Sequence, residues 1–172
     1  MIPVSPNDIV CDASPLIFLA KLDALHLIQN LLGPRVIVLR CVADEILSPS
    51  AGALERRRLE AFLNTVYIVD FSESGYESRA LSQADCRILT YAVRVKASWL
   101  VVDERLLRRV AVSEGLRVVG FLGLLIEAAR SGAMSAESVR QSVKTAISAH
   151  HLRISLQLYQ QLIARLEDIT ES

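Results

Sequence analysis

The sequence predicts an α/β protein built around one parallel sheet of about five strands. Short apolar runs rich in β-branched residues alternate with amphipathic stretches, which is the pattern of strands that alternate with helices. The runs are continuously apolar, as expected for strands that are buried on both faces of a parallel sheet. Hydrophobic residues make up 52% of the 172 residues, which is ample for a single packed core.

The apolar runs predict five strands, at residues 9–11, 36–39, 66–69, 99–102 and 117–119. The first helix should follow the first strand, with Ser14 as its N-cap and Pro15 at its first position. Helical spacing and stop signals predict the others, at residues 25–32, 42–47, 53–63, 84–96, 104–114, 121–131, 136–149 and 155–167.

The last two predicted helices follow one another with no strand between them. The chain is therefore expected to divide into a main domain, residues 1–134, and a helical extension, residues 135–172. The extension should pack on the main domain or on a partner.

Composition narrows the class of protein. The 19 basic and 19 acidic residues give a formal net charge of zero, which argues against a protein that coats nucleic acid broadly but allows a local binding site. The three scattered cysteines form no CxxC pair, so we expect reduced thiols in a cytoplasmic protein rather than a zinc site. The start of the chain lacks the features of a signal peptide, and no apolar run reaches the ~20 residues of a membrane span.

Four acidic residues are predicted to lie at the edge of the sheet where the strands end. Asp12 directly follows the first strand, and Asp103 directly follows the fourth. Glu45 lies in the first helix after the second strand, and Asp85 opens the helix that leads back into the fourth strand. Because chemistry in parallel α/β sheets gathers at the carboxyl ends of the strands, these four side chains are expected to converge.

Converging carboxylates repel one another and raise each other's pKa, so such a cluster is costly without cations. Carboxylate oxygens are hard ligands that suit Mg²⁺ or Mn²⁺. Metals held in this way commonly activate water and stabilise charge on a phosphodiester oxygen. The cluster therefore indicates metal-dependent cleavage of a phosphodiester.

Each acid also has a purely structural interpretation. Asp85 would close a capping box that begins at Ser82, and Asp103 would be the N-cap of its helix. Asp12 would be an Asx-turn residue, and Glu45 a solvated helix residue that helical spacing does not separate from Asp44. For each acid taken singly, the structural interpretation is favoured over a functional one. Because all four acids are predicted to lie on one edge of the sheet, a shared metal site is favoured for the four together.

Several segments resemble the PIN-domain family, and the match is strongest with an uncharacterised bacterial and archaeal branch related to toxin–antitoxin nucleases. The similarity covers nearly the whole chain. The segments are IVCDASPLI (9–17) with LAKL (19–22), VADEI (42–46), VVDER (101–105) with residues 109–111, GL (115–116), GFLGLL (120–125), and LRIS (152–155) with LY (158–159).

The resemblance implies a PIN-like three-layer α/β/α sandwich with extra C-terminal helices, and a metal-dependent ribonuclease. It implies Mg²⁺ or Mn²⁺ as cofactor, RNA as substrate, often a homodimer, and an antitoxin protein as a partner if the chain is a toxin. It selects Glu45 over Asp44. It assigns catalysis and metal binding to Asp12, Glu45, Asp85 and Asp103, with Ser14 supporting Asp12.

Two positions depart from this branch. The third motif commonly has Gly-Glu, where this chain has Ala84 and Asp85, and Asp85 has a shorter reach. The motif after the fourth strand often has two aspartates, where this chain has Asp103 and Glu104. Glu104 and Arg105 are expected beside the site. Arg105, Arg108 and Arg109 would either contact substrate phosphates or form a solvated basic face of their helix, with Arg105 in an ion pair.

Two other functions compete with the nuclease. The departures at Asp85 and Glu104 would suit a PIN-like binding or regulatory module with weak catalysis. A phosphoacceptor receiver-like domain would need an aspartate after the third strand, for which Asp70 is available, and a lysine after the fifth, which the chain lacks. No Gly-rich phosphate-binding loop follows the first strand, so dinucleotide and ATP chemistry are unsupported.

Overall fold

The computed structural model describes residues 5, 7–49, 51–76 and 80–170. Five parallel strands form one sheet in the order β3-β2-β1-β4-β5. The strands are β1 (Ile9–Cys11), β2 (Val36–Leu39), β3 (Tyr67–Val69), β4 (Trp99–Val101) and β5 (Val118–Val119). Each lies within a residue or so of the apolar run that predicts it.

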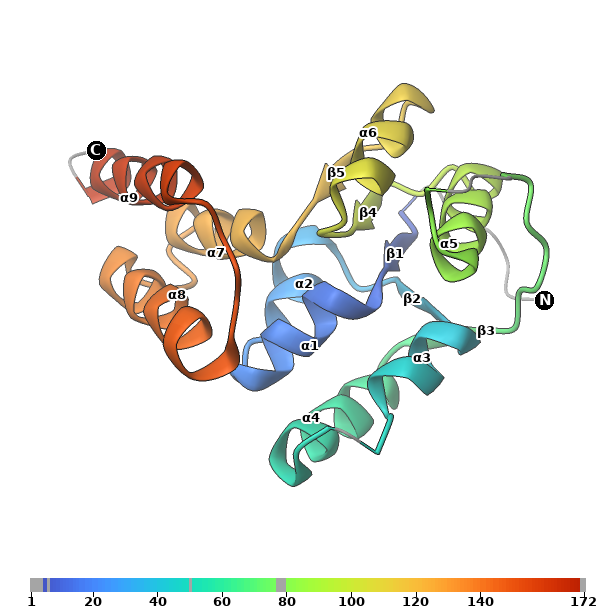
Figure 1. Cartoon of the computed structure of the whole chain (residues 1–172), viewed down its shortest axis with the longest axis horizontal. Coiled ribbons are helices and arrows are strands. Elements are labelled where there is room, and N and C mark those ends of the chain that lie inside the picture. The colour runs from blue at the N-terminus through green and yellow to red at the C-terminus, as the bar shows by residue number, and fades with distance from the viewer. Residues whose placement is uncertain (1–4, 6, 50, 77–79, 171–172) are drawn as a thin grey trace.

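Helices connect the strands and complete the chain (Figure 1). They are α1 (Ala13–Lys21), α2 (His26–Leu32), α3 (Arg40–Ile46), α4 (Ala53–Leu63), α5 (Gln83–Arg94), α6 (Arg105–Ser113), α7 (Phe121–Arg130), α8 (Ala136–His150) and α9 (Leu156–Thr170). All residues of β1 and β2 are buried, so the sheet is covered on both faces, as the predicted α/β architecture requires.

The predicted start of α1 is wrong. The helix begins at Ala13 with Asp12 as the N-cap residue, so Ser14 and Pro15 lie inside its first turn. The chain passes from β1 into α1 without an intervening loop. Pro15 is tolerated because the first N–H groups of a helix have no intrahelical acceptor in any case.

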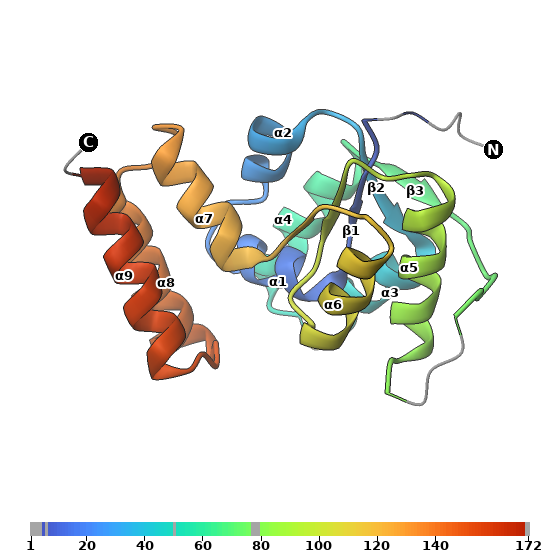
Figure 2. The ribbon, with the colours of Figure 1, turned by 90° about the horizontal axis from the view of Figure 1, so that it is seen from above.

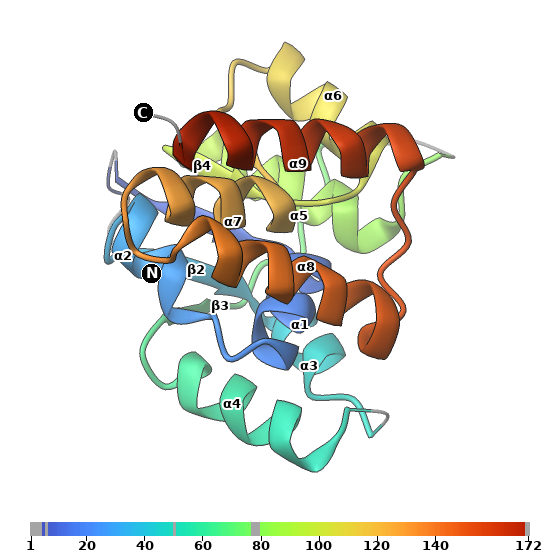
Figure 3. The ribbon, with the colours of Figure 1, turned by 90° about the vertical axis from the view of Figure 1, so that its left-hand side faces the viewer.

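The two C-terminal helices lie side by side at the opposite end of the molecule from α5 (Figures 1 and 2). Both contact α7, and α8 also contacts α1, as seen from the end of the molecule in Figure 3. Val139, Val143 and Leu162 are buried and belong to the same hydrophobic core as the strands. The extension therefore packs on the main domain through a shared core.

The sheet order bears on the receiver-like alternative. The doubly wound receiver order is 2-1-3-4-5, in which the third strand is central. Here β3 is an edge strand, and Asp70 after it is 83% exposed and pairs with Arg40 over 3.8 Å. Asp70 is thus remote from the centre of the sheet, and the receiver-like interpretation is not supported.

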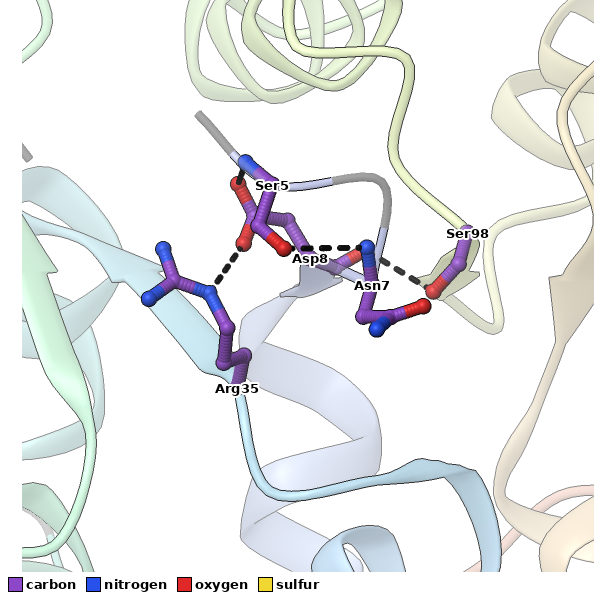
Figure 4. Close-up of polar contacts among 5 residues, drawn as sticks. All are labelled: Ser5, Asn7, Asp8, Arg35 and Ser98. Carbon is purple, nitrogen blue, oxygen red and sulfur yellow. Dashed lines mark hydrogen bonds and ion pairs between the residues drawn. The ribbon is translucent and has the colours of Figure 1, made fainter. Parts of the chain in front are cut away.

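A buried ion pair fixes the opposite edge of the sheet, where the strands begin (Figure 4). Asp8, which is 1% exposed, accepts a 2.8 Å hydrogen bond from Nε of Arg35, and its other oxygen accepts from the backbone of Ser5 at 3.0 Å. The backbone and hydroxyl of Ser98 both donate to the Asp8 carbonyl, at 2.8 and 3.1 Å. These contacts tie together the starts of β1, β2 and β4.

Replacing Asp8 by asparagine is therefore expected to lower the free energy of unfolding by roughly 1–3 kcal/mol, because Arg35 loses its charged partner. Urea denaturation measures the change. Asp70→Asn is the matched control, since Asp70 is exposed and its ion pair is long, and it should change stability by less than about 0.5 kcal/mol. Equal effects of the two substitutions would contradict this role of Asp8.

In the described part of the chain, no single helix is long and apolar enough to cross a membrane. Taken together, α1 and α2 satisfy the length and composition test, but they are bent by 115° at their junction.

Candidate metal centre at the carboxyl edge of the sheet

The chain places all four predicted acids at the edge of the sheet where the strands end. Asp12 follows the central strand β1, and Asp103 comes shortly after its neighbour β4. Glu45 lies on α3, which leaves β2, and Asp85 lies in the first turn of α5. Residues distant in sequence are thus collected by the parallel topology, as expected.

Asp12 is the buried centre of the cluster. It is 9% exposed, and its backbone N–H donates to the Val101 carbonyl of β4 at 2.9 Å. The pKa of its carboxyl is raised from 3.8 to about 7, and burial is the largest cause. A hydrogen bond from the Ala13 backbone opposes this shift, and the charges of Asp85, Glu45 and Asp103 contribute to it. The other three carboxylates are therefore near enough to Asp12 to repel its charge.

Glu45 and Asp44 are both exposed on α3, but they differ in their effect on Asp12. Glu45 contributes to the raised pKa of Asp12, whereas Asp44 is not among its causes. Glu45 is thus the acid of α3 that faces the cluster, which agrees with the residue selected by the resemblance.

Asp85 takes part in two arrangements. It closes the capping box of α5: its Oδ2 accepts from the Ser82 backbone at 3.0 Å, and its own backbone donates to the Ser82 hydroxyl at 3.0 Å. Its charge also raises the pKa of Asp12. The structural interpretation of Asp85 is therefore correct, but it does not remove Asp85 from the cluster, because the helix start itself lies at this edge.

Asp103 has one satisfied and one unsatisfied oxygen. Oδ1 accepts a 2.9 Å hydrogen bond from the backbone N–H of Phe121, the first residue of α7. Oδ2 is buried and has no hydrogen-bond partner among the described residues. Burial raises the pKa of Asp103, while the Phe121 N–H, the Arg108 charge and the Ser14 hydroxyl lower it. An unpartnered buried carboxylate oxygen is costly and is suited to receive a cation.

Ser14 and Glu104 both make contacts that were not predicted. Ser14 is predicted to support Asp12, and in the structure its hydroxyl lies near Asp103. Glu104 is the N-cap of α6, and its side chain accepts a hydrogen bond from the Leu107 backbone. The N-cap of α6 is therefore Glu104 and not Asp103, which leaves the Asp103 side chain to the cluster.

Two residues lie beside Asp103 in ways that were not predicted: Arg108 was expected only as a phosphate contact or a solvated residue, and Gly120 was not predicted as part of the site. Arg108 donates to the Val102 carbonyl at 3.1 Å, and its charge acts on Asp103. Gly120 lies against the Asp103 carboxylate, where a side chain would collide with it. The available signal was positional: Gly120 directly follows β5, which pairs with β4, the strand that precedes Asp103.

The donor set suits a hard divalent cation, but the side chains do not form a ready coordination sphere. Among the described residues, no three His, Cys, Asp or Glu side chains are close enough to hold a metal ion. Our expectation that all four would already lie within reach of a shared metal is therefore wrong. The capping box holds one oxygen of Asp85 at the Ser82 backbone. The raised pKa of Asp12 and the unpartnered Oδ2 of Asp103 are what a cation would relieve.

Comparisons with known proteins identify the family to which this chain belongs. A family model described as a PIN domain matches residues 8–168. A PilT N-terminus domain protein from the hyperthermophilic archaeon Sulfolobus solfataricus is similar in structure, with a TM-score of 0.50 and 11% sequence identity, over 86% of this chain and 99% of that one. A comparison with curated proteins gave no match. PIN domains are generally nucleases and generally use divalent metal ions. The five-stranded parallel fold and a family match over most of its length show that this chain belongs to the PIN-domain family.

Proposed function

We propose that this protein is an endoribonuclease that depends on Mg²⁺ or Mn²⁺ and hydrolyses phosphodiester bonds at Asp12, Glu45, Asp85 and Asp103. The observation that carries the proposal is Asp12 itself. A carboxylate whose pKa is raised by burial and also by three other carboxylates is costly in a folded protein unless a cation binds there.

In this proposal Asp12 and Asp103 would be the principal metal ligands, because both are largely buried and follow neighbouring strands. Glu45 and Asp85 would complete the set from α3 and α5. The metal would supply activation of water and stabilisation of charge on the phosphodiester oxygen. The protein supplies the ends of two neighbouring strands, after which Asp12 and Asp103 follow.

Substrate phosphates would be held by α6. Arg105 and Arg109 are both exposed, lie four residues apart on one helix, and form no ion pair within the described segments. Like charges at this spacing disfavour a helix, so their proximity to the acidic edge favours a role in binding an anion. Arg108 is not available in the same way, because it is engaged with Val102 and Asp103.

Metal-dependent cleavage of RNA by the purified protein tests the proposal. We expect cleavage in Mg²⁺ or Mn²⁺ that EDTA abolishes and that excess metal restores. The alternative, a PIN-like binding module with weak catalysis, predicts binding of RNA without cleavage. The departures at Asp85 and Glu104 are the features that favour this alternative.

We also propose a location for the protein and the partners that it binds. We place the protein in the cytoplasm and regard an antitoxin as its partner if it acts as a toxin. Leu156 and Leu158, at the start of α9, are 72% and 42% exposed. Leu156 lines an apolar groove of about 650 Å³ between the end of α8 and the start of α9. We expect these leucines to pack against a second copy of the chain. Light scattering that shows a monomer at all concentrations would contradict the homodimer.

A further inference from the structure

The turn that joins β5 to α7 lies directly against Asp103. Strands β4 and β5 are paired with Val101 opposite Val119, and the Val102 backbone donates to the Val119 carbonyl at 2.8 Å. Gly120 directly follows Val119, and Asp103 lies two residues beyond Val101. The pairing of the two strands therefore brings the chain that carries Asp103 alongside the turn.

Gly120 is needed here because of space, not because of backbone conformation. Its φ of −109° is accessible to any residue. A Cβ at this position, however, would collide with Oδ1 of Asp103, and it would lie 2.6 Å from Nη1 of Arg108 and 3.2 Å from the Val102 carbonyl oxygen. The side chain of Asp103 thus occupies the space that any larger residue at position 120 would take.

Phe121 provides the second half of the turn. Its N–H donates to Oδ1 of Asp103 at 2.9 Å, at the positive end of α7. Its ring is 1% exposed and packs against Phe18, with ring centres 5.4 Å apart. The donor is therefore attached to a rigid, buried side chain and holds one particular oxygen of the carboxylate.

The two oxygens of the Asp103 carboxylate are therefore in different environments. Oδ1 is engaged by the backbone, while Oδ2 is buried and makes no hydrogen bond of normal geometry in the described part of the chain, although the Ser14 hydroxyl lies near the carboxylate. A carboxylate that served only to cap α7 would have no reason to bury its second oxygen without a partner. The asymmetry calls for a ligand at Oδ2.

We propose that Gly120 and the Phe121 N–H are positioning groups of the metal centre, which hold Asp103 by Oδ1 so that Oδ2 is presented to the cation. This inference rests on the proposed function and deepens it. It assigns a role to the GFLGLL segment, which otherwise belongs only to the family resemblance.

Mn²⁺ binding to the metal-free protein, measured by calorimetry, tests the assignment. Gly120→Ala should weaken binding by about 10–100-fold, as expected when a group that orients a metal ligand is disturbed. Gly123→Ala is the matched control on the same helix: its Cβ would meet only a side-chain carbon of Val119, at 3.0 Å, and it should bind Mn²⁺ as the wild type does. Gly120→Ala that binds as tightly as the wild type would overturn the inference. Wild-type protein that binds no Mn²⁺ would instead overturn the proposed function on which it rests.

A second measurement needs no variant and holds even if Gly120→Ala does not fold. The chain has four phenylalanines, so ¹⁵N-phenylalanine labelling gives few amide signals. Addition of Mg²⁺ to wild-type protein should shift the Phe121 amide and leave that of Phe62, on α4, unchanged. A Phe121 amide that does not respond while calorimetry shows binding would overturn the assignment.

Discussion

Replacement of Asp12 by asparagine is expected to reduce metal-dependent RNA cleavage on the order of 100-fold or more, because the central ligand of the cluster loses its charge. The fold should persist, since asparagine keeps the shape of the side chain and an oxygen that can accept from Ala13. Cleavage of a labelled RNA at saturating Mg²⁺ measures the effect. Asp44→Asn is the matched control, because Asp44 is an exposed acid next to Glu45 that does not act on Asp12.

The same variant separates catalysis from stability. Without metal at pH 8, Asp12→Asn should raise the melting temperature by about 2–10 °C, because it removes a buried charge and its repulsion from three carboxylates. Loss of cleavage together with gain of stability is the signature of a site in which stability is given up for function. Cleavage at the wild-type rate by Asp12→Asn would refute the catalytic assignment.

The stability of the metal-free protein should fall as the pH rises from about 4 to 8. The pKa of Asp12 is raised from 3.8 to about 7, so across this range the folded state holds a proton that the unfolded chain has lost. Stability from this group is complete below its unfolded pKa and disappears as the pH passes its folded pKa. The full shift corresponds to roughly 4 kcal/mol, and we expect between about 1 and 4 kcal/mol. Burial of Asp103 acts in the same direction.

Urea denaturation in EDTA at several pH values measures this dependence, and the difference between wild type and Asp12→Asn isolates the contribution of Asp12. The two proteins should be most similar near pH 4, with the variant more stable at pH 8. Excess Mg²⁺ should reduce the loss at high pH, because the metal binds the ionised form. A difference between the two proteins that does not change with pH would contradict the buried, charge-coupled environment of Asp12.

The sequence was sufficient to predict the sheet and the residues at its edge. Continuously apolar runs identify buried parallel strands, and chain order then places Asp12, Glu45, Asp85 and Asp103 at one edge, because helices return antiparallel to the strands that they precede. The start of α1 was mispredicted because Ser14 and Pro15 form a typical capping pattern, whereas the short connection after β1 decides the helix boundary.

The contacts around the Asp103 side chain could not be predicted from the sequence. Which oxygen the Phe121 N–H holds, and how close Gly120 comes, depend on the register of β4 and β5 and on side-chain packing. The capping box at Ser82 and Asp85 was predicted as an alternative to the cluster, yet Asp85 closes the box and its charge also acts on Asp12. A residue at a helix start can satisfy the backbone and act on a neighbouring charge at once, so local motifs do not exclude a site.

The most direct test of the metal centre is a crystal of the protein soaked in Mn²⁺ and examined by anomalous scattering. We predict an anomalous peak at the carboxyl edge of the sheet, within about 2.0–2.6 Å of oxygens of Asp12 and Asp103. For Asp103 the bound oxygen should be Oδ2, with Oδ1 still held by Phe121. Strong anomalous peaks only elsewhere on the protein, or none at a Mn²⁺ concentration that supports cleavage, would contradict the assignment of these four acids as the metal centre.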